Sequence, residues 1–127
     1  MVADYPTDLP DDWEGSIPEY FVMWALFKLG YKDRFDYQKP FGGGRLQKGG
    51  TVIDFYLPEL NLVIMVQSVR YHYTQIEQRI ADNLIRAMLL SSGYRVVYID
   101  EEDALSNPIF YVQEALKGID MSRMAGR

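Results

Sequence analysis

The sequence of 127 residues contains no cysteine and a single histidine, His72. Without cysteine, the chain forms neither a disulfide nor a zinc–thiolate site, and it has no cysteine nucleophile. One histidine also argues against a histidine-based triad and against a metal site built from several histidines. The lack of cysteine fits a reducing compartment, so we expect a cytoplasmic protein.

Long apolar runs and a basic N-terminal segment are absent as well. A membrane helix needs about 20 consecutive apolar residues, so we expect no membrane contact. Residues 1–15 are acidic and contain two prolines, which is unlike a signal peptide. We predict an acidic flexible leader over 1–15, in which Trp13 could anchor onto a surface. A single domain over 16–118 and a C-terminal tail over 119–127 complete the predicted organisation.

The composition is otherwise that of a folded globular protein, with 48% apolar and 24% charged residues. The net charge of −5 argues against a strongly basic nucleic-acid binder. Between Arg34 and Arg95, however, eight basic and five acidic residues make the middle of the chain mildly basic. This excess permits contact with phosphates without requiring it.

Hydrophobic periodicity and turn residues predict an α/β protein. We expect helices over 17–29 and 74–90, a last helix from 100 that breaks at Asn107–Pro108, and strands over 35–39, 51–57, 62–66 and 95–99. The short link between the second and third strands predicts an antiparallel pair, whereas the last strand needs a crossover. A small mixed sheet with helices on both faces satisfies this order. The four acids from Asp100 to Asp103 suit a helix start and are interpreted as structural.

Asp54 is the first candidate for chemistry, because it lies inside the otherwise apolar strand 51–57. A carboxylate at such a place is costly unless it is exposed, paired or bound to a metal. Strand alternation predicts that it faces away from Ile53 and Phe55. The structural interpretation is a solvent-facing residue on an edge strand.

Glu19, Gln67 and the glycine-rich segment 41–50 are further candidates with structural interpretations of their own. Ser16 and Glu19 have the spacing of a capping box, and Gln67 follows an apolar strand and could mark its end. The segment 41–50 holds five glycines but matches neither a P-loop nor a dinucleotide fingerprint. It could be a hairpin tip or a basic loop that touches a nucleic-acid backbone.

Four segments together carry a family resemblance: Ser16–Glu19 opening a helix, Gly49–Pro58, Leu62–Gln67 and Tyr71–His72. They resemble the PD-(D/E)XK nuclease superfamily, in particular its small, very-short-patch-repair-like and phage-type members. The likeness spans residues 16–100. It implies a restriction-endonuclease-like αβββαβ core and a relationship to DNA endonucleases or resolvases of phages and mobile elements.

The resemblance also implies a role for each motif residue. Asp54 would ligate Mg²⁺ or Mn²⁺, with Glu19 supporting the metal site. Gln67 stands where the family usually has a lysine that positions the attacking water. Met65 stands where a second metal-binding acid is expected, and a thioether is a poor ligand for Mg²⁺. The resemblance therefore implies a nuclease fold that is catalytically impaired.

Two alternative functions stay open beside this prediction. An active Mg²⁺-dependent DNA endonuclease would need a relocated carboxylate, for which Glu77 and Asp82 are candidates. The other alternative is a non-catalytic structural or protein-interaction module of a phage assembly. Such a module would be virion-associated and would act with a protein partner or as a homodimer. A domain that binds DNA without cleaving it lies between them. The side chains expected to contact DNA are Arg45, Lys48, Arg70, His72 and Arg79.

Overall fold

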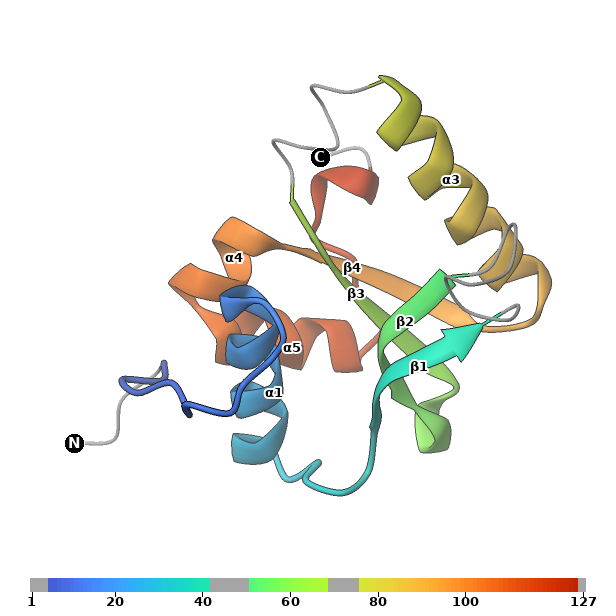
Figure 1. The fold of residues 1–127 in the computed structure, drawn as a ribbon. Coiled ribbons are helices and arrows are strands. Elements are labelled where there is room, and N and C mark those ends of the chain that lie inside the picture. The colour runs from blue at the N-terminus through green and yellow to red at the C-terminus, as the bar shows by residue number, and fades with distance from the viewer. Residues whose placement is uncertain (1–4, 42–50, 69–75, 126–127) are drawn as a thin grey trace.

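The computed structural model describes residues 5–41, 51–68 and 76–125, which form one four-stranded sheet with helices on both faces (Figure 1). In chain order the elements are α1 (Ile17–Lys28), β1 (Asp36–Phe41), β2 (Thr51–Leu57), the 3₁₀ turn η2 (Pro58–Leu60), β3 (Leu62–Gln67), α3 (Ile76–Ser91), β4 (Arg95–Asp100), α4 (Glu101–Ser106), α5 (Pro108–Leu116) and the 3₁₀ turn η3 (Arg123–Ala125). The predicted α/β class is confirmed. Within the described ranges, no helix combines the length and the apolar character needed to cross a membrane.

The sheet has the strand order β1-β2-β3-β4 and is mixed. β2 pairs antiparallel with β1 and with β3, whereas β3 pairs parallel with β4. Asn61 makes the tight link between β2 and β3 with a left-handed backbone, φ 49°, which asparagine tolerates better than most residues. The predicted antiparallel hairpin and the crossover before the last strand are both confirmed.

The first strand extends further than the sequence predicted. Pro40 was expected to close it, but β1 continues to Phe41, and Pro40 is the register partner of Val52. Proline has no N–H to donate to a neighbouring strand, so it is tolerated at the edge of a sheet. β1 is such an edge strand, which explains why the chain continues through Pro40.

Helices α1, α4 and α5 cover one face of the sheet (Figure 1). The core beneath them joins Val22 and Leu26 of α1 to Val112 of α5 and to Phe55 and Ile64 of the sheet, all fully buried. Burial of this kind stabilises the fold by about 25 cal/mol per Å² of apolar surface. The face is therefore the main hydrophobic core, and it fixes α1 and its N-terminus against the hairpin.

Helix α3 covers the opposite face and buries Leu89 there. The recurrence of Ile76, Ile80 and Leu84 at helical spacing predicts a one-sided helix that buries them together with Leu89, and this prediction is wrong. These three side chains are 66%, 56% and 60% exposed. With 3.6 residues per turn they lie on the side of α3 opposite Leu89, so the helix carries two apolar sides.

Residues 119–125, predicted as part of a tail, lie against β4. The Asp120 carboxylate accepts the N–H of Tyr98 at 3.0 Å and the N–H of Ser122 at 2.9 Å. Arg123 donates its own N–H to Asp100 at 3.1 Å, and Ser122 is buried. Since β4 is an edge strand, Asp120 supplies an acceptor that a further strand would otherwise provide.

Candidate functional site

Asp54 lies at a point of β2 where the sheet is irregular on both sides. The pairing of β2 with β3 ends where Phe55 faces Ile64, and beyond it Asp54 Oδ2 accepts the N–H of Val66 at 2.8 Å. On the other side, the β1 register passes over Gln38, whose φ of 55° is left-handed. Unusual backbone conformations of this kind cluster at functional sites. The irregular centre of the hairpin is therefore the leading candidate site.

The irregularity overturns two expectations for Asp54. Ile53 packs in the cluster beneath α3, whereas Phe55 packs in the core beneath α1, so they do not share the face that strict alternation predicted. The period-two rule applies to regularly paired strands, and this strand is disrupted at the residue between them. The edge-strand interpretation is also wrong, because β2 lies between β1 and β3.

Glu19 lies in the first turn of α1, which Ser16 caps, and also reaches the hairpin through Tyr37. Its Oε2 accepts from the Ser16 hydroxyl at 3.0 Å, and its Oε1 accepts from the Tyr37 hydroxyl at 2.6 Å. Burial raises the pKa of Tyr37, and the hydrogen bond and charge of Glu19 followed by the charge of Asp54 raise it further. Tyr37 therefore remains protonated and lies within electrostatic reach of both predicted acids.

The N-terminal segment covers Tyr37 through Trp13. The Trp13 ring centroid lies 5.3 Å from that of Tyr37 and 5.1 Å from that of Tyr20, and its Nε1 donates to the Ser16 carbonyl at 2.9 Å. A Cβ at Gly15 would collide with the Tyr37 hydroxyl and the Trp13 ring, so this position needs glycine. The expected anchoring of Trp13 onto the domain is confirmed.

Met65 lies on the α3 face of β3, half-buried, with Tyr98 of β4 as its register partner. Burial raises the pKa of Tyr98, and the charge of Asp82 on α3 raises it further, followed by a smaller effect from Asp54. The charge of Asp82 therefore reaches Tyr98 on this face of the sheet, whereas the Glu77 side chain is exposed. Of the two candidate replacement acids, Asp82 is the one whose charge acts on Tyr98, the register partner of Met65.

Gln67 and Asp100 form a buried polar pair at the carboxyl ends of β3 and β4. They are register partners, 8% and 4% exposed, and Gln67 Nε2 and Asp100 Oδ1 have no hydrogen-bond partner among the described residues. Burial raises the pKa of Asp100. Unpartnered buried polar atoms are uncommon in folded proteins. Sequence analysis missed this feature of Asp100, because the acids that follow it suggested only a helix start.

Four of the five residues predicted to contact DNA cannot be placed in the structure. Arg45, Lys48, Arg70 and His72 lie outside the described residues, as does most of the glycine-rich segment. Arg79 lies on α3 and is half-buried. These assignments stay predictions.

The residues at the hairpin do not fit a divalent-metal centre. Across 5–41, 51–68 and 76–125, no three Asp, Glu, His or Cys side chains are arranged to hold a metal ion. Asp54 accepts a backbone N–H, both oxygens of Glu19 accept hydroxyl hydrogen bonds, and Met65 offers only sulfur. Mg²⁺ prefers octahedral coordination by oxygen, which this set does not supply.

Comparison with known proteins gives no further assignment. No family model matches the chain, and neither a curated protein nor a solved structure shows significant similarity to it.

Proposed function

We propose that this chain is a PD-(D/E)XK-like nuclease-fold protein, related to phage or mobile-element DNA endonucleases and resolvases, in which metal-dependent cleavage is lost or strongly impaired. Its support is the irregular hairpin around Asp54 and the link from Glu19 through Tyr37 to that hairpin. A mixed sheet with helices on both faces is compatible with this fold. DNA is the proposed partner, bound without efficient cleavage.

The proposed loss of metal-dependent cleavage rests on Met65. One position beyond the last β2–β3 pair, the strands continue with Asp54 on β2 and Met65 on β3. Phosphodiester hydrolysis of this type needs carboxylates that hold the metal ion, and a thioether supplies neither the charge nor the hard oxygen. Gln67 is neutral as well, so it lacks the charge of the lysine usual at its position.

Placing an acid at position 65, where the family has one, tests the proposal. Wild-type protein should bind Mn²⁺ weakly in isothermal titration calorimetry and leave linear and branched DNA intact with Mg²⁺ or Mn²⁺. Met65→Asp should bind Mn²⁺ about tenfold more tightly, which corresponds to about 1.4 kcal/mol. Adding Asp54→Asn to Met65→Asp should abolish this gain. Met88→Asp, which adds the same charge on α3, is the matched control and should gain nothing.

Two outcomes would contradict the proposal in different ways. Efficient cleavage by wild-type protein that is lost in Asp54→Asn would show a live enzyme, and loss in Asp82→Asn but not in Glu77→Gln would name the relocated acid. A folded Met65→Asp variant with unchanged Mn²⁺ affinity would mean that Asp54 and position 65 do not form the expected metal site.

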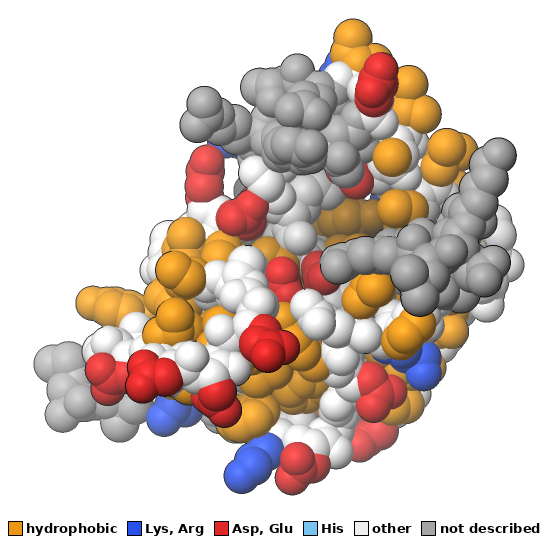
Figure 2. All heavy atoms as spheres, in the orientation of Figure 1, with side chains coloured by type: hydrophobic (Ala, Val, Ile, Leu, Met, Phe, Trp, Pro, Cys, Tyr) orange, Lys and Arg blue, Asp and Glu red, His pale blue; other side chains and the backbone are white. Residues whose placement is uncertain are grey.

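A second candidate function is a protein-interaction module, favoured by the outer side of α3. Ile76, Ile80 and Leu84 recur every four residues and are more than half exposed. Figure 2 shows hydrophobic side chains along this helix on the surface of the molecule. An exposed apolar row on a helix is the usual feature of a helix that packs against another protein.

A further inference from the structure

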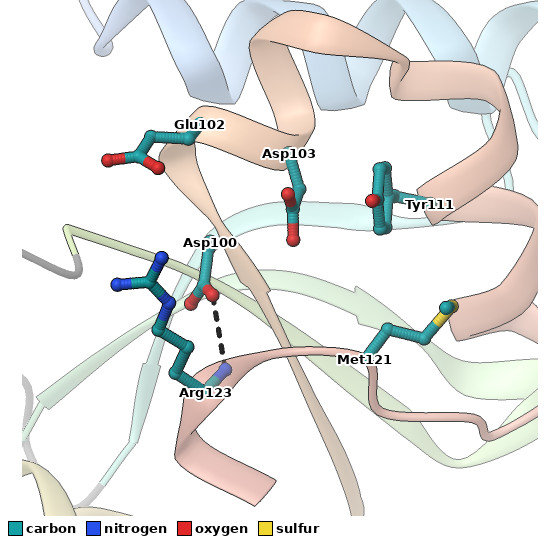
Figure 3. A pocket seen from close by; sticks show the side chains of 6 residues that line it. All are labelled: Asp100, Glu102, Asp103, Tyr111, Met121 and Arg123. Atoms are coloured by element: carbon teal, nitrogen blue, oxygen red, sulfur yellow. Dashed lines mark hydrogen bonds between the residues drawn. The ribbon is translucent and has the colours of Figure 1, made fainter. Parts of the chain in front are cut away.

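A small pocket lies where β4 ends, beside Asp100. It has a volume of about 210 Å³, below the roughly 300–1,000 Å³ of pockets for drug-sized ligands. Its walls come from the end of β4, the first turn of α4, α5 and the segment that follows α5 (Figure 3). The lining residues are Asp100, Glu102, Asp103, Tyr111, Met121 and Arg123.

Asp100 distinguishes this pocket from an ordinary acidic helix start. It occupies the N-cap position of α4, yet its side chain makes no capping hydrogen bond. Instead, Oδ2 accepts the N–H of Arg123 at 3.1 Å, as the dashed line in Figure 3 shows. Oδ1 has no partner among the described residues, although Asp100 is 96% buried in the pocket wall. A buried carboxylate oxygen of this kind calls for a donor.

The arrangement suits an extended organic cation better than a metal ion. The three carboxylates of Asp100, Glu102 and Asp103 are not arranged to share one ion, since the described residues contain no such cluster. Arg123 offsets one of their charges, which leaves the lining with a formal charge of −2. Ammonium groups donate hydrogen bonds to separate carboxylates, and Tyr111 and Met121 line the pocket beside them.

We propose that this pocket binds primary ammonium groups, carried by a small diamine or by a lysine side chain. Asp100 Oδ1 accepts one ammonium hydrogen bond, and Glu102 and Asp103 provide the remaining negative charge. Arg123 competes with the ligand for the same carboxylates. The proposal does not rest on the nuclease function, because it uses neither Asp54 nor Glu19, although Gln67 is the register partner of Asp100.

Calorimetry of the full chain at low salt tests this site with two probes, 1,4-diaminobutane and acetyl-Gly-Lys-Gly-amide. At least one should bind saturably, and the identity of that probe distinguishes the two sources. Asp100→Asn, which keeps the shape of the side chain, should weaken binding about tenfold or more. Arg123→Gln should strengthen it, because a competing cation is removed while its backbone N–H is kept. Higher salt should weaken binding.

Glu102→Gln and Glu77→Gln provide matched controls. Glu102→Gln removes an exposed charge of the pocket and should weaken binding without affecting the fold, whereas Glu77→Gln removes an exposed acid of α3 and should leave binding unchanged. The proposal is overturned if neither probe binds at millimolar concentration, or if Asp100→Asn and Arg123→Gln bind as the wild type does. Binding of MgCl₂ that excludes both probes would also overturn it.

Discussion

At the scale of single residues, Tyr37 connects parts of the molecule that lie far apart in the sequence. Its hydroxyl donates to Glu19, its ring packs against Trp13 in a tilted arrangement, and its pKa responds to the charge of Asp54. The hydroxyl thus compensates for the partial burial of the Glu19 carboxylate. Tyr37 therefore links Glu19 to the hairpin that carries Asp54.

Tyr37→Phe should lower the free energy of unfolding by about 1–2 kcal/mol, because a hydrogen bond to a charged acceptor is lost while the ring is kept. Urea denaturation followed by fluorescence measures the change. Tyr56→Phe is the matched control, since its hydroxyl reaches Asn61 Oδ1 at a longer 3.4 Å. That variant should lose less than about 0.5 kcal/mol. Equal losses in the two variants would show that the hydrogen bond from Tyr37 to Glu19 contributes no more to stability than the one from Tyr56 to Asn61.

What the sequence could predict at this scale depended on distance along the chain. The contact between Ser16 and Glu19 follows from a spacing of three residues and was correctly predicted. Tyr37 was not singled out, because its partner lies 18 residues away. The unpartnered oxygen of Asp100 depends on where Arg123 is placed, and no local pattern contains that information.

At the scale of elements, β4 depends on a segment that is not a strand. Its outer edge would present unpaired N–H groups, which commonly recruit other chains. Asp120 accepts one of these groups, from Tyr98, and η3 packs Met124 into the cluster beneath α3. The edge is therefore protected by side chains and by a short turn.

Asp120→Ala should destabilise the protein by about 1–3 kcal/mol, since the buried N–H of Tyr98 loses its acceptor. Amide hydrogen exchange should locate the effect, with faster exchange at Tyr98 and unchanged protection at Phe55. Asp36→Ala, at an exposed ion pair of 3.9 Å, is the control and should cost less than about 0.5 kcal/mol. Unchanged exchange at Tyr98 in the Asp120 variant would exclude the proposed protection.

Most elements could be predicted because their signals are local. Thr51–Leu57 is a run of β-branched and aromatic residues, and β2 has these bounds. The break at Asn107–Pro108 separates α4 from α5 as expected. For α3, periodicity indicated an apolar side but could not decide which of two such sides faces the sheet. That choice depends on the surface offered by Tyr98 and its neighbours.

At the scale of the whole molecule, the exposed row of Ile76, Ile80 and Leu84 on α3 bears on whether the protein is a monomer or forms an assembly. We expect wild-type protein to associate with itself through Ile80 and Leu84, so that its apparent mass in size-exclusion chromatography with light scattering rises with concentration. The double substitution Ile80→Lys and Leu84→Lys should keep the helical circular dichroism signal and abolish the rise.

Leu105→Lys on α4 serves as the control for this experiment, because Leu105 is exposed but lies outside the row. It should behave as the wild type does. A wild-type protein that stays monomeric at every concentration, and whose chromatographic behaviour the double substitution does not change, would remove self-association as a role for this surface.

The attachment of residues 119–125 to β4 also sets an order for folding during synthesis. The hairpins of β1, β2 and β3 form from neighbouring segments, and such local contacts are made quickly. β4 joins them only after the crossover helix has formed. The Tyr98 N–H gains its acceptor later still, when Asp120 has emerged from the ribosome and docked. The outer edge of β4 therefore stays open until residues 119–125 have docked, and an open strand edge of this kind is prone to aggregation.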